Sequence, residues 1–349
     1  MFRQIYVSLL LAVFIPPSAA WALTISNTCN GLLLAVTNQQ NVTIRPLESI
    51  KQLKVVTYNL ENFRVGAPGA VGPTKNPKGD VVVAKDPKLV NDQINIVNTL
   101  DADIVAFEEV YDFNSLKVID PSKYTPLMIL GNDNQRNIGF GVKSDLPLYV
   151  EMETHKTVTW FDKDAKQQAL LFSRDLPVIL LRTAPDRDPA YIVVGNHGKS
   201  KRDRPNDKES VDLRTAQYQQ AQKIIEDYQT RFPKAVILMA GDFNADVNNG
   251  PEVAPIRNLM KSPFDIKNIP QEQRITEIYF NDQEQAEFSQ LDNIFISANG
   301  AAQVLSIRVV PYYDQQGREK PYPKSFQERQ QNDSDHYPVE LVISTASQF

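Results

Sequence analysis

The sequence has little cysteine, little histidine and no long apolar run after its first residues. Cys29 is the only cysteine among 349 residues, so a disulfide framework within the chain is excluded and stability must come from the core. No later stretch offers the roughly 18 to 20 apolar residues that a membrane-spanning helix needs. With 42% hydrophobic and 23% charged residues and a formal net charge of −5, the composition is that of an ordinary globular protein and indicates no function by itself.

Several motifs that commonly reveal an activity are also absent. The chain has no GxxxxGK followed by Ser or Thr, no GxGxxG, no GxSxG and no CxxC. These absences remove the commonest signals for a phosphate-cradling nucleotide loop, a serine esterase and a zinc cluster. No internal repeat is present either.

The first 22 residues have the pattern of a secretory signal peptide. Arg3 precedes the apolar run "VSLLLAVFI", and the segment closes with Ala20, Trp21 and Ala22. We therefore predict cleavage near Ala22 and a secreted or periplasmic mature chain, with an uncleaved N-terminal anchor as the alternative. In "SNTC", the residues before Cys29 are not the small apolar residues expected ahead of a lipid-modified cysteine, so we do not expect a lipid anchor.

Short apolar runs of strand length recur along the rest of the chain, and strands outnumber helices. Two longer stretches have helical periodicity: 87–100, and 211–229 with Ser210 as its predicted N-cap. The first of these places four apolar residues near one face, which predicts a core-facing helix: Leu89, Ile94, Val97 and Leu100. The predicted strands read "LKVVTYNL", "ADIVAFEEV", "NIGFGVK", "LPVILLRT", "YIVVGNH", "KAVILMAGDFN", "LDNIFIS", "VLSIRVV" and "HYPVELVIS".

No Gly-, Pro- or Ser-rich linker with a change of composition across it divides the chain, so one domain is expected. We assign residues 1–22 to the signal peptide, 23–50 to an N-terminal extension and 51–349 to the domain. Two turn-rich insertions, 65–79 and 311–332, are long enough to be mobile or to serve in binding.

Polar side chains that are uncommon in protein cores stand at the ends of these apolar strands. Carboxylates and amides gathered at one end of a sheet suit a hard divalent cation such as Mg²⁺, Mn²⁺ or Ca²⁺. Histidines beside such a cation can take or donate a proton, and a carboxylate behind a histidine fixes its tautomer. His336, placed where a loop enters a strand, is therefore interpreted as a general base. The set comprises Asn59, Glu109, His197, Asp242, Asn244, Asp292, Asp335 and His336.

These residues lie in motifs that resemble a known family. "TYNLENF", "FEEV", "NHGKSK", "GDFNAD", "LDNIF" and "SDHYPV" resemble, in order, the motif set of the endonuclease/exonuclease/phosphatase superfamily, the metal-dependent phosphoesterases that include pancreatic deoxyribonuclease. The resemblance spans about residues 55–342. It implies an α/β (α+β) fold, a four-layer sandwich of two packed mixed β-sheets with helices on the outer faces, and a catalytic rim along one edge.

The resemblance also implies a metal site. Glu109 would be the principal ligand of Mg²⁺, with Mn²⁺ or Ca²⁺ as alternatives, Asn59 would lie beside it and Asp335 would contribute. The family usually has Gln before the ligand glutamate, whereas this chain has Glu108. That extra carboxylate either tightens metal binding or points elsewhere.

The remaining motif residues take catalytic roles by the same resemblance. His336 would pair with Asp292 as the base, and His197 would stabilise or protonate on the opposite face. Asp242 and Asn244 would orient the attacking water and the scissile phosphate.

Other residues are candidates for substrate binding or for structure. Asn137 in "RNIGF" and Arg174 in "LFSRDLP" resemble phosphate-contacting positions of the family, and a structural role is open for both. The third histidine, His155, has no partner motif and is predicted to be an exposed strand residue.

A basic run, "GKSKRDR" at 198–204, begins directly after His197. Its cations, led by Lys199, can contact phosphates that flank a scissile one, which favours a nuclease acting on DNA or RNA. We also expect a monomer without stable membrane insertion. "NHGKSK" followed by Arg214 also resembles exported bacterial nucleases. Two alternatives are a lipid-directed phosphodiesterase or phosphatase and a binding protein without turnover. The aromatic residues that could form an interfacial loop, or could instead stack on bases, are Tyr312, Tyr313, Tyr322 and Phe326.

Overall fold

The computed structural model describes residues 33–35, 43–66, 74–75, 81–133, 135–314 and 316–348. The predicted signal peptide with its cleavage position near Ala22, and Cys29, lie outside these residues. Most of the 65–79 insertion lies outside them as well.

The first mixed sheet has seven strands, and the second has six. In spatial order the first sheet comprises β1 (Leu33–Ala35), β6 (Tyr124–Ile129), β7 (Asn137–Lys143), β5 (Ile104–Val110), β2 (Gln52–Phe63), β19 (Val339–Ser344) and β18 (Val304–Val309). The second comprises β14 (Met260–Lys261), β17 (Asp292–Ser297), β13 (Val236–Asp242), β12 (Pro189–His197), β11 (Val178–Arg182) and β8 (Tyr149–Glu153). All nine predicted strands are present.

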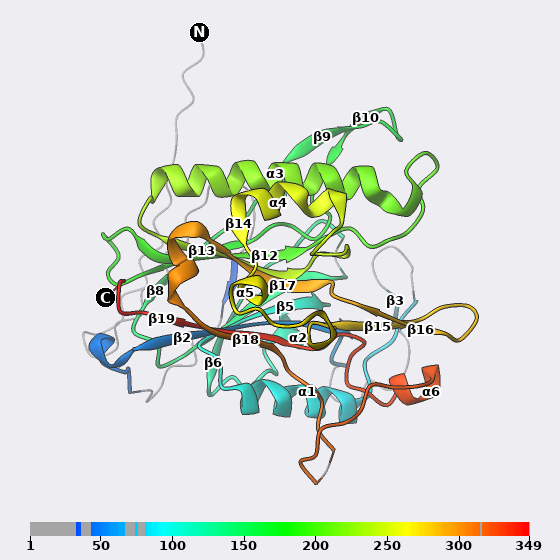
Figure 1. Cartoon of the computed structure of the whole chain (residues 1–349), viewed down its shortest axis with the longest axis horizontal. Coiled ribbons are helices and arrows are strands. Elements are labelled where there is room, and N and C mark those ends of the chain that lie inside the picture. Colours follow the sequence, from blue (N-terminus) through cyan, green and yellow to red (C-terminus); the bar gives the residue numbers. More distant parts are fainter. Residues whose placement is uncertain are drawn as a thin grey trace.

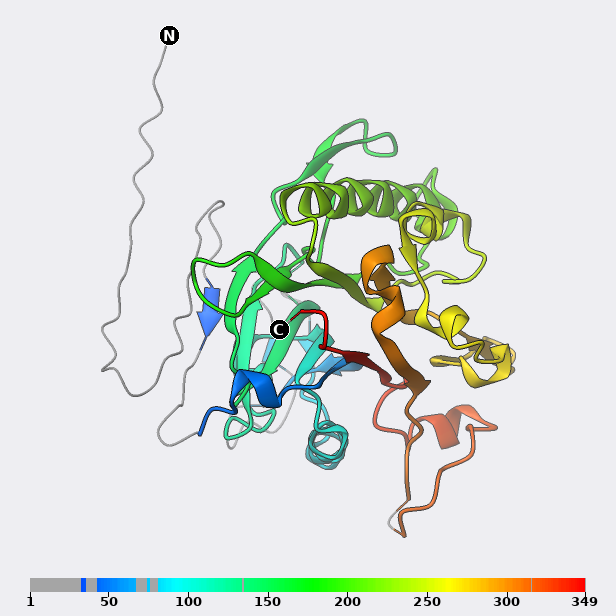
Figure 2. The ribbon, with the colours of Figure 1, turned by 60° about the vertical axis from the view of Figure 1, so that its left-hand side comes forward.

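The two sheets pack face to face, and helices cover both outer faces. Strand residues alternate between faces, so Val55, Ile104, Leu238 and Ile294 meet in the core between the sheets. Each aliphatic side chain buried there stabilises the fold by about 1.5–3 kcal/mol. Helix α1 (Pro87–Leu100) covers the first sheet, while α3 (Val211–Arg231) and α4 (Ala254–Leu259) cover the second (Figure 1). Figure 2 shows α1 nearly end on, across both sheets from α3. The predicted four-layer sandwich is confirmed.

The boundaries of α1 are those predicted, but its buried face is rotated. Asp86 caps the helix by accepting from the Lys88 backbone N–H at 2.7 Å, and Asp101 ends it in the left-handed region. Leu89, expected in the core, is only half-buried, and Val90 takes its place.

The predicted cap of α3 is wrong. Ser210 has a φ of 53°, and its hydroxyl donates to the Arg202 carbonyl instead of accepting from the helix. Asp207 caps the first turn, accepting from the backbone N–H of Asp212 at 2.8 Å and of Leu213 at 3.2 Å. The chain must turn sharply before the helix, so the cap comes from farther back.

Parts of the predicted N-terminal extension contact the domain. Residues 33–35 pair with β6, and Ile50, which is 4% exposed, joins the core between the sheets. Among the described residues, none of the helices is long and apolar enough to cross a membrane.

Short elements complete the described fold. The hairpins are β3 (Thr74–Lys75) with β4 (Val81–Val82), β9 (Thr159–Asp162) with β10 (Gln167–Leu170), and β15 (Glu277–Phe280) with β16 (Ala286–Ser289). The short α-helices are α2 (Phe113–Leu116), α5 (Pro263–Ile266) and α6 (Phe326–Arg329). Short 3₁₀ helices cover Leu47–Ser49, Lys208–Ser210, Pro251–Val253, Gln271–Gln273 and Ala298–Gln303.

Candidate active site

Three predicted site residues stand in one row across the second sheet. His197 ends β12 beside Asp242, which ends the parallel strand β13, and Asp242 is in register with Asp292 at the start of antiparallel β17. Asp242 continues the alternation of Leu238 and Ala240, so it extends the face that meets the other sheet. The row therefore lies at the rim between the two sheets.

Asp242 is the centre of the site. Its carboxylate accepts from the Asn59 amide at 3.1 Å, and from the backbone and side chain of Asn244 at 2.7 and 2.9 Å. The Nε2 atoms of His197 and His336 lie 3.6 and 3.9 Å from its Oδ2. Burial raises the pKa of Asp242 to about 7, although the charged ring of His336 opposes that shift. The structure thus brings both predicted histidines to one carboxylate.

His336 and Asp292 form the predicted pair. Nδ1 of His336 is 2.8 Å from Oδ2 of Asp292, and both side chains are buried. Burial disfavours the charged ring, yet the carboxylates of Asp292 and Asp242 together raise the pKa of His336 well above its usual value. The pair is therefore arranged to accept and hold a proton on His336.

His197 has the opposite electrostatic character. Burial, followed by the positive charges of Arg174 and His336, lowers the pKa of His197 well below its usual value. Its Nε2 lies 3.8 Å from Glu109 Oε1, and its buried Nδ1 has no hydrogen-bond partner. A ring held neutral suits a hydrogen-bond donor better than a proton donor.

The two glutamates of "FEEV" point in different directions. Glu108 continues the inward alternation of β5, accepts from the Thr57 hydroxyl at 2.8 Å and is fully buried. Burial and the nearby Asp292 raise the pKa of Glu108 well above its usual value. Glu109 has a φ of 59° within an irregularity of the ladder, which turns its side chain to the rim. Glu109 is thus the accessible carboxylate of the two.

The predicted metal ligands Glu109 and Asp335 each form an ion pair with an arginine. Glu109 accepts from the Asn62 backbone N–H at 2.9 Å and lies 3.3 Å from Arg136 Nε. Asp335 lies 2.7 Å from Arg329 Nη2, and its other oxygen lies 3.9 Å from His336 Nε2. Sequence reasoning missed both arginines. Arg136 directly precedes the quoted Asn137, which was the one available signal.

One group of donors in the described part of the chain could hold a metal ion. Its atoms come from Asp242, Asp292 and His336, lie within 4.8 Å of one another and are buried. Oδ1 of Asp292 has no hydrogen-bond partner, as expected of a carboxylate oxygen free to bind a cation. Carboxylate oxygens fit a hard divalent ion. This group differs from the predicted set: Asn59 contacts Asp242 and Asp335 lies near His336, whereas Glu109 lies beside His197.

Asn137 and Arg174 are held by the protein itself. Asn137 accepts from the Gly131 backbone N–H at 2.8 Å and donates to the Val110 and Tyr111 carbonyls, so its amide bridges loops at the rim. Arg174, 6% exposed, donates to the Gly198 carbonyl at 2.7 Å. Both support the site structurally, and Arg174 adds positive charge beside His197.

The basic residues of the 198–204 run differ in their exposure and in their ion pairs. Arg204 forms ion pairs with Asp162, with Asp207 at 3.2 Å and with Asp164 at 3.7 Å, so its charge is already compensated. Lys199 is half-buried, and burial lowers the pKa of its amine to about 8. The neighbouring Lys201 and Arg202 are exposed.

His155, predicted as an exposed strand residue, lies just after β8 and is half-buried. Its Nδ1 is 2.9 Å from the Leu176 carbonyl oxygen, and its ring meets Tyr228 edge on at 6.2 Å. It belongs to the packing under α3 and not to the rim.

No protein-family model matches the sequence, and no curated protein matches it. Solved structures match its fold. D. rerio TDP2 complexed with single strand DNA product is 13% identical, covering 83% of this chain and 98% of that one at a TM-score of 0.51. Sphingomyelinase C from Streptomyces griseocarneus is 18% identical, with coverages of 84% and 99% and a TM-score of 0.50.

A third match gives the class its name. An endonuclease/exonuclease/phosphatase family protein from Bacteroides thetaiotaomicron is 14% identical, with coverages of 84% and 97% and a TM-score of 0.50. The chain has the fold of the endonuclease/exonuclease/phosphatase superfamily, as the motifs predicted. A fold of this kind is shared by proteins with different substrates, so the substrate must be argued from the site.

Proposed function

We propose that the protein is an exported, metal-dependent phosphodiesterase that hydrolyses nucleic acid, DNA or RNA. The observation that carries this proposal is the buried His336–Asp292 pair, bonded at 2.8 Å and facing Asp242 together with His197. Two histidines of opposite pKa shift around one carboxylate suit acid–base chemistry better than packing.

Each side chain has a separate task in the proposed reaction. His336 takes a proton from the attacking water through Nε2, and Asp292 stabilises the imidazolium that forms. Asp242, fixed by Asn59 and Asn244, orients that water. His197, kept neutral, donates a hydrogen bond to a phosphate oxygen.

The proposed ion is Mg²⁺, with Mn²⁺ or Ca²⁺ as alternatives. Glu109, Asn59 and Asp335 would hold it. When bound, the ion neutralises charge on the phosphate and on the departing oxygen. Arg136 and Arg329 balance the negative charges of Glu109 and Asp335.

Nucleic acid is favoured by the basic residues next to His197. Lys199, Lys201 and Arg202 can neutralise phosphates on either side of the scissile one without reading sequence. The likeness to D. rerio TDP2, whose structure was solved in complex with a single-strand DNA product, supports the same substrate class. Export and a monomeric state are proposed with it, and the mature N-terminus and the mass in solution would test them.

A lipid phosphodiester is the second candidate, since exposed aromatic side chains lie near the rim. Tyr279, Phe288 and Phe326 are about half exposed, at 52%, 50% and 47%, and the β15–β16 hairpin pairs with His336 through Glu277. Tyr312, expected in such a surface, is instead buried at 1%. The fold likeness to sphingomyelinase C supports this alternative.

The test is cleavage by the purified chain of single- and double-stranded DNA, RNA and sphingomyelin, each with Mg²⁺ or with chelator. Metal-dependent cleavage of nucleic acid, lost in His336→Ala and kept in His155→Ala, is expected. Cleavage of sphingomyelin alone would favour the lipid candidate. No turnover of any of these would leave a binding protein of this fold.

A further inference from the structure

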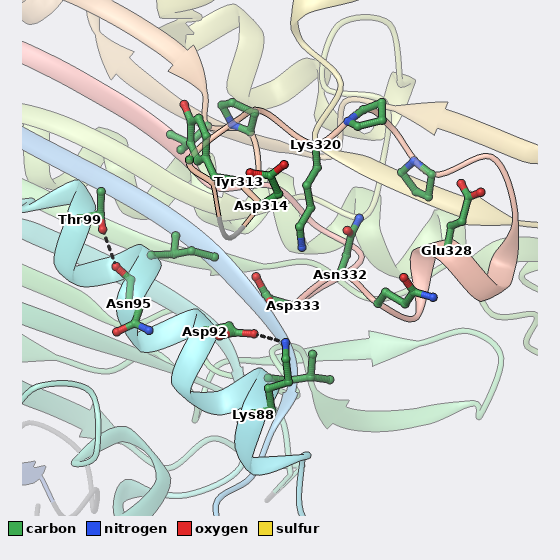
Figure 3. Close-up of a pocket in the computed structure, with 18 of the residues that line it drawn as sticks. Lys88, Asp92, Asn95, Thr99, Tyr313, Asp314, Lys320, Glu328, Asn332 and Asp333 are labelled. Atoms are coloured by element: carbon green, nitrogen blue, oxygen red, sulfur yellow. Dashed lines mark hydrogen bonds and ion pairs between the residues drawn. The ribbon is translucent and has the colours of Figure 1, made fainter.

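A groove apart from the catalytic residues runs between α1 and the segment 310–333 (Figure 3). Its volume is about 1250 Å³, above the roughly 300–1,000 Å³ usual for small-molecule pockets, so it admits an extended ligand. Leu89, Ile96 and Leu100 of α1 form one apolar wall, and Val310 and Pro311 lie among the residues of the other. None of the proposed catalytic residues lines it.

The groove carries a surplus of negative charge. Five carboxylates line it against two lysines, Lys88 and Lys320, so it favours a cation over an anion. The five are Asp86, Asp92, Asp314, Glu328 and Asp333.

Four of these carboxylates already have partners in the chain. Asp92 lies 2.6 Å from Lys88 Nζ, and Asp314 lies 2.7 Å from Arg318 Nη2. Asp86 and Glu328 accept from backbone N–H groups at 2.7 Å. The ion pairs neutralise Asp92 and Asp314, whereas backbone hydrogen bonds leave the charges of Asp86 and Glu328 in place. These two carboxylates and Asp333 carry the surplus.

Asp333 is the exception. It is 5% exposed, and within the described residues its carboxylate accepts no hydrogen bond and has no ion pair within 4.0 Å. Figure 3 shows it between Lys320 and α1, facing the groove. The charges of Lys320 and Lys88 act on it only from farther away. The oxygens of Asp333 are not among the fully enclosed polar atoms that lack a partner, so the carboxylate opens into the groove. Its charge is only partly solvated there, and a ligand cation can reach it.

We propose that this groove binds an aliphatic polyamine, with one ammonium group on Asp333. The methylene segments would lie on Leu89, Ile96 and Leu100, because such a ligand alternates charged and apolar parts as the groove does. The size of the groove and its surplus of negative charge both favour a chain with several ammonium groups over a single amine.

Calorimetric titration of spermine into the full chain, in metal-free buffer at fixed ionic strength, tests the proposal. Asp333→Asn keeps the shape and removes the charge, and should weaken binding by at least about tenfold, as expected for the loss of a charge-assisted hydrogen bond. The matched control, Asp186→Asn, changes an exposed acid outside the groove and should bind as the parent does. Lys320→Gln removes a competing cation and should tighten binding.

A second readout separates binding from misfolding. Asp333→Asn should melt at or above the parent temperature without spermine, since an unpaired buried charge is gone, and should lose the rise that spermine gives the parent. Equal affinity in parent and Asp333→Asn would overturn the proposal. Binding of an octalysine peptide without binding of spermine would also overturn it, in favour of a protein partner.

Discussion

If His336 and Asp292 act as one catalytic unit, removing either should cost nearly as much as removing both. The variants are His336→Ala, Asp292→Ala and the double replacement. The pair is buried and bonded at 2.8 Å, and no other histidine could replace the ring: His197 lies across Asp242, and His155 is under α3.

The magnitude follows from the task of each residue. Loss of a positioned base costs about 10² to 10⁴ in turnover, which is roughly 2.7–5.5 kcal/mol of barrier at about 1.36 kcal/mol per tenfold. Without Asp292 the ring loses its tautomer and the partner of its charged form, so a similar loss is expected. Independent residues would together lose about 10⁴ to 10⁸, whereas a unit loses little more than either single variant.

The assay is single-turnover cleavage with saturating Mg²⁺, corrected for the folded fraction by thermal melting. His155→Ala is the matched control, and should lower stability while sparing turnover of the folded protein. Additive losses would break the pair, and a His336→Ala protein that cleaves at close to the parent rate would refute the assignment of the base.

Three further changes test the site and its surroundings. Chelator should abolish activity, and Mg²⁺ or Mn²⁺ should restore it. Glu109→Gln should cost more activity than Glu108→Gln, because Glu109 reaches the rim whereas Glu108 is buried against Thr57; the reverse order would mean that the roles of the two glutamates were exchanged. Replacing Lys199, Lys201 or Arg202 by a neutral residue should reduce the slope of log affinity for nucleic acid against log salt concentration by roughly 0.7–0.9 per residue. Arg204→Gln should leave this slope unchanged and lower the melting temperature instead. Burial raises the pKa of Asp333 from 3.8 to about 6, so the folded protein binds this proton more tightly than the unfolded chain, and its stability falls as the pH rises from about 4 to about 6. Melting curves should therefore show Asp333→Asn to be more stable than the parent at pH 7, with the difference shrinking towards pH 4. A stability difference that is independent of pH would contradict this.

Much of the site could be predicted from the sequence because it lies at strand ends. An apolar run that stops at Asp242 or His197 is visible in one dimension, and parallel strands bring their carboxyl ends to one edge of a sheet. The order of the motifs then predicted the sandwich, and the geometry around Asp242 agrees with it.

Other features depend on backbone detail that the sequence does not display. Strand alternation alone predicts that Glu108 and Glu109 face opposite sides, but only the left-handed backbone at Glu109 decides which one reaches the rim. Asp207, and not Ser210, caps α3 because the chain turns sharply there.

Long-range partners were equally hidden. The compensation of Arg204 comes from Asp162 and Asp164, about forty positions earlier in the chain. The groove was missed because its two walls, α1 and the segment 310–333, are separated by most of the sequence. Such pairs become visible only when the tertiary fold is known.

The row of His197, Asp242 and Asp292 depends on the strand backbone and not on the loops around it. Its spacing is set by backbone pairing of three adjacent strands, and at Gly241, where φ is 150°, an added Cβ would lie 1.8 Å from the Asn196 carbonyl oxygen. Insertions in the segment 310–333 or in the β15–β16 hairpin leave that pairing untouched. Changes in these loops would therefore alter substrate choice without moving the side chains at the rim. Specificity and the proposed chemistry can change independently in this fold.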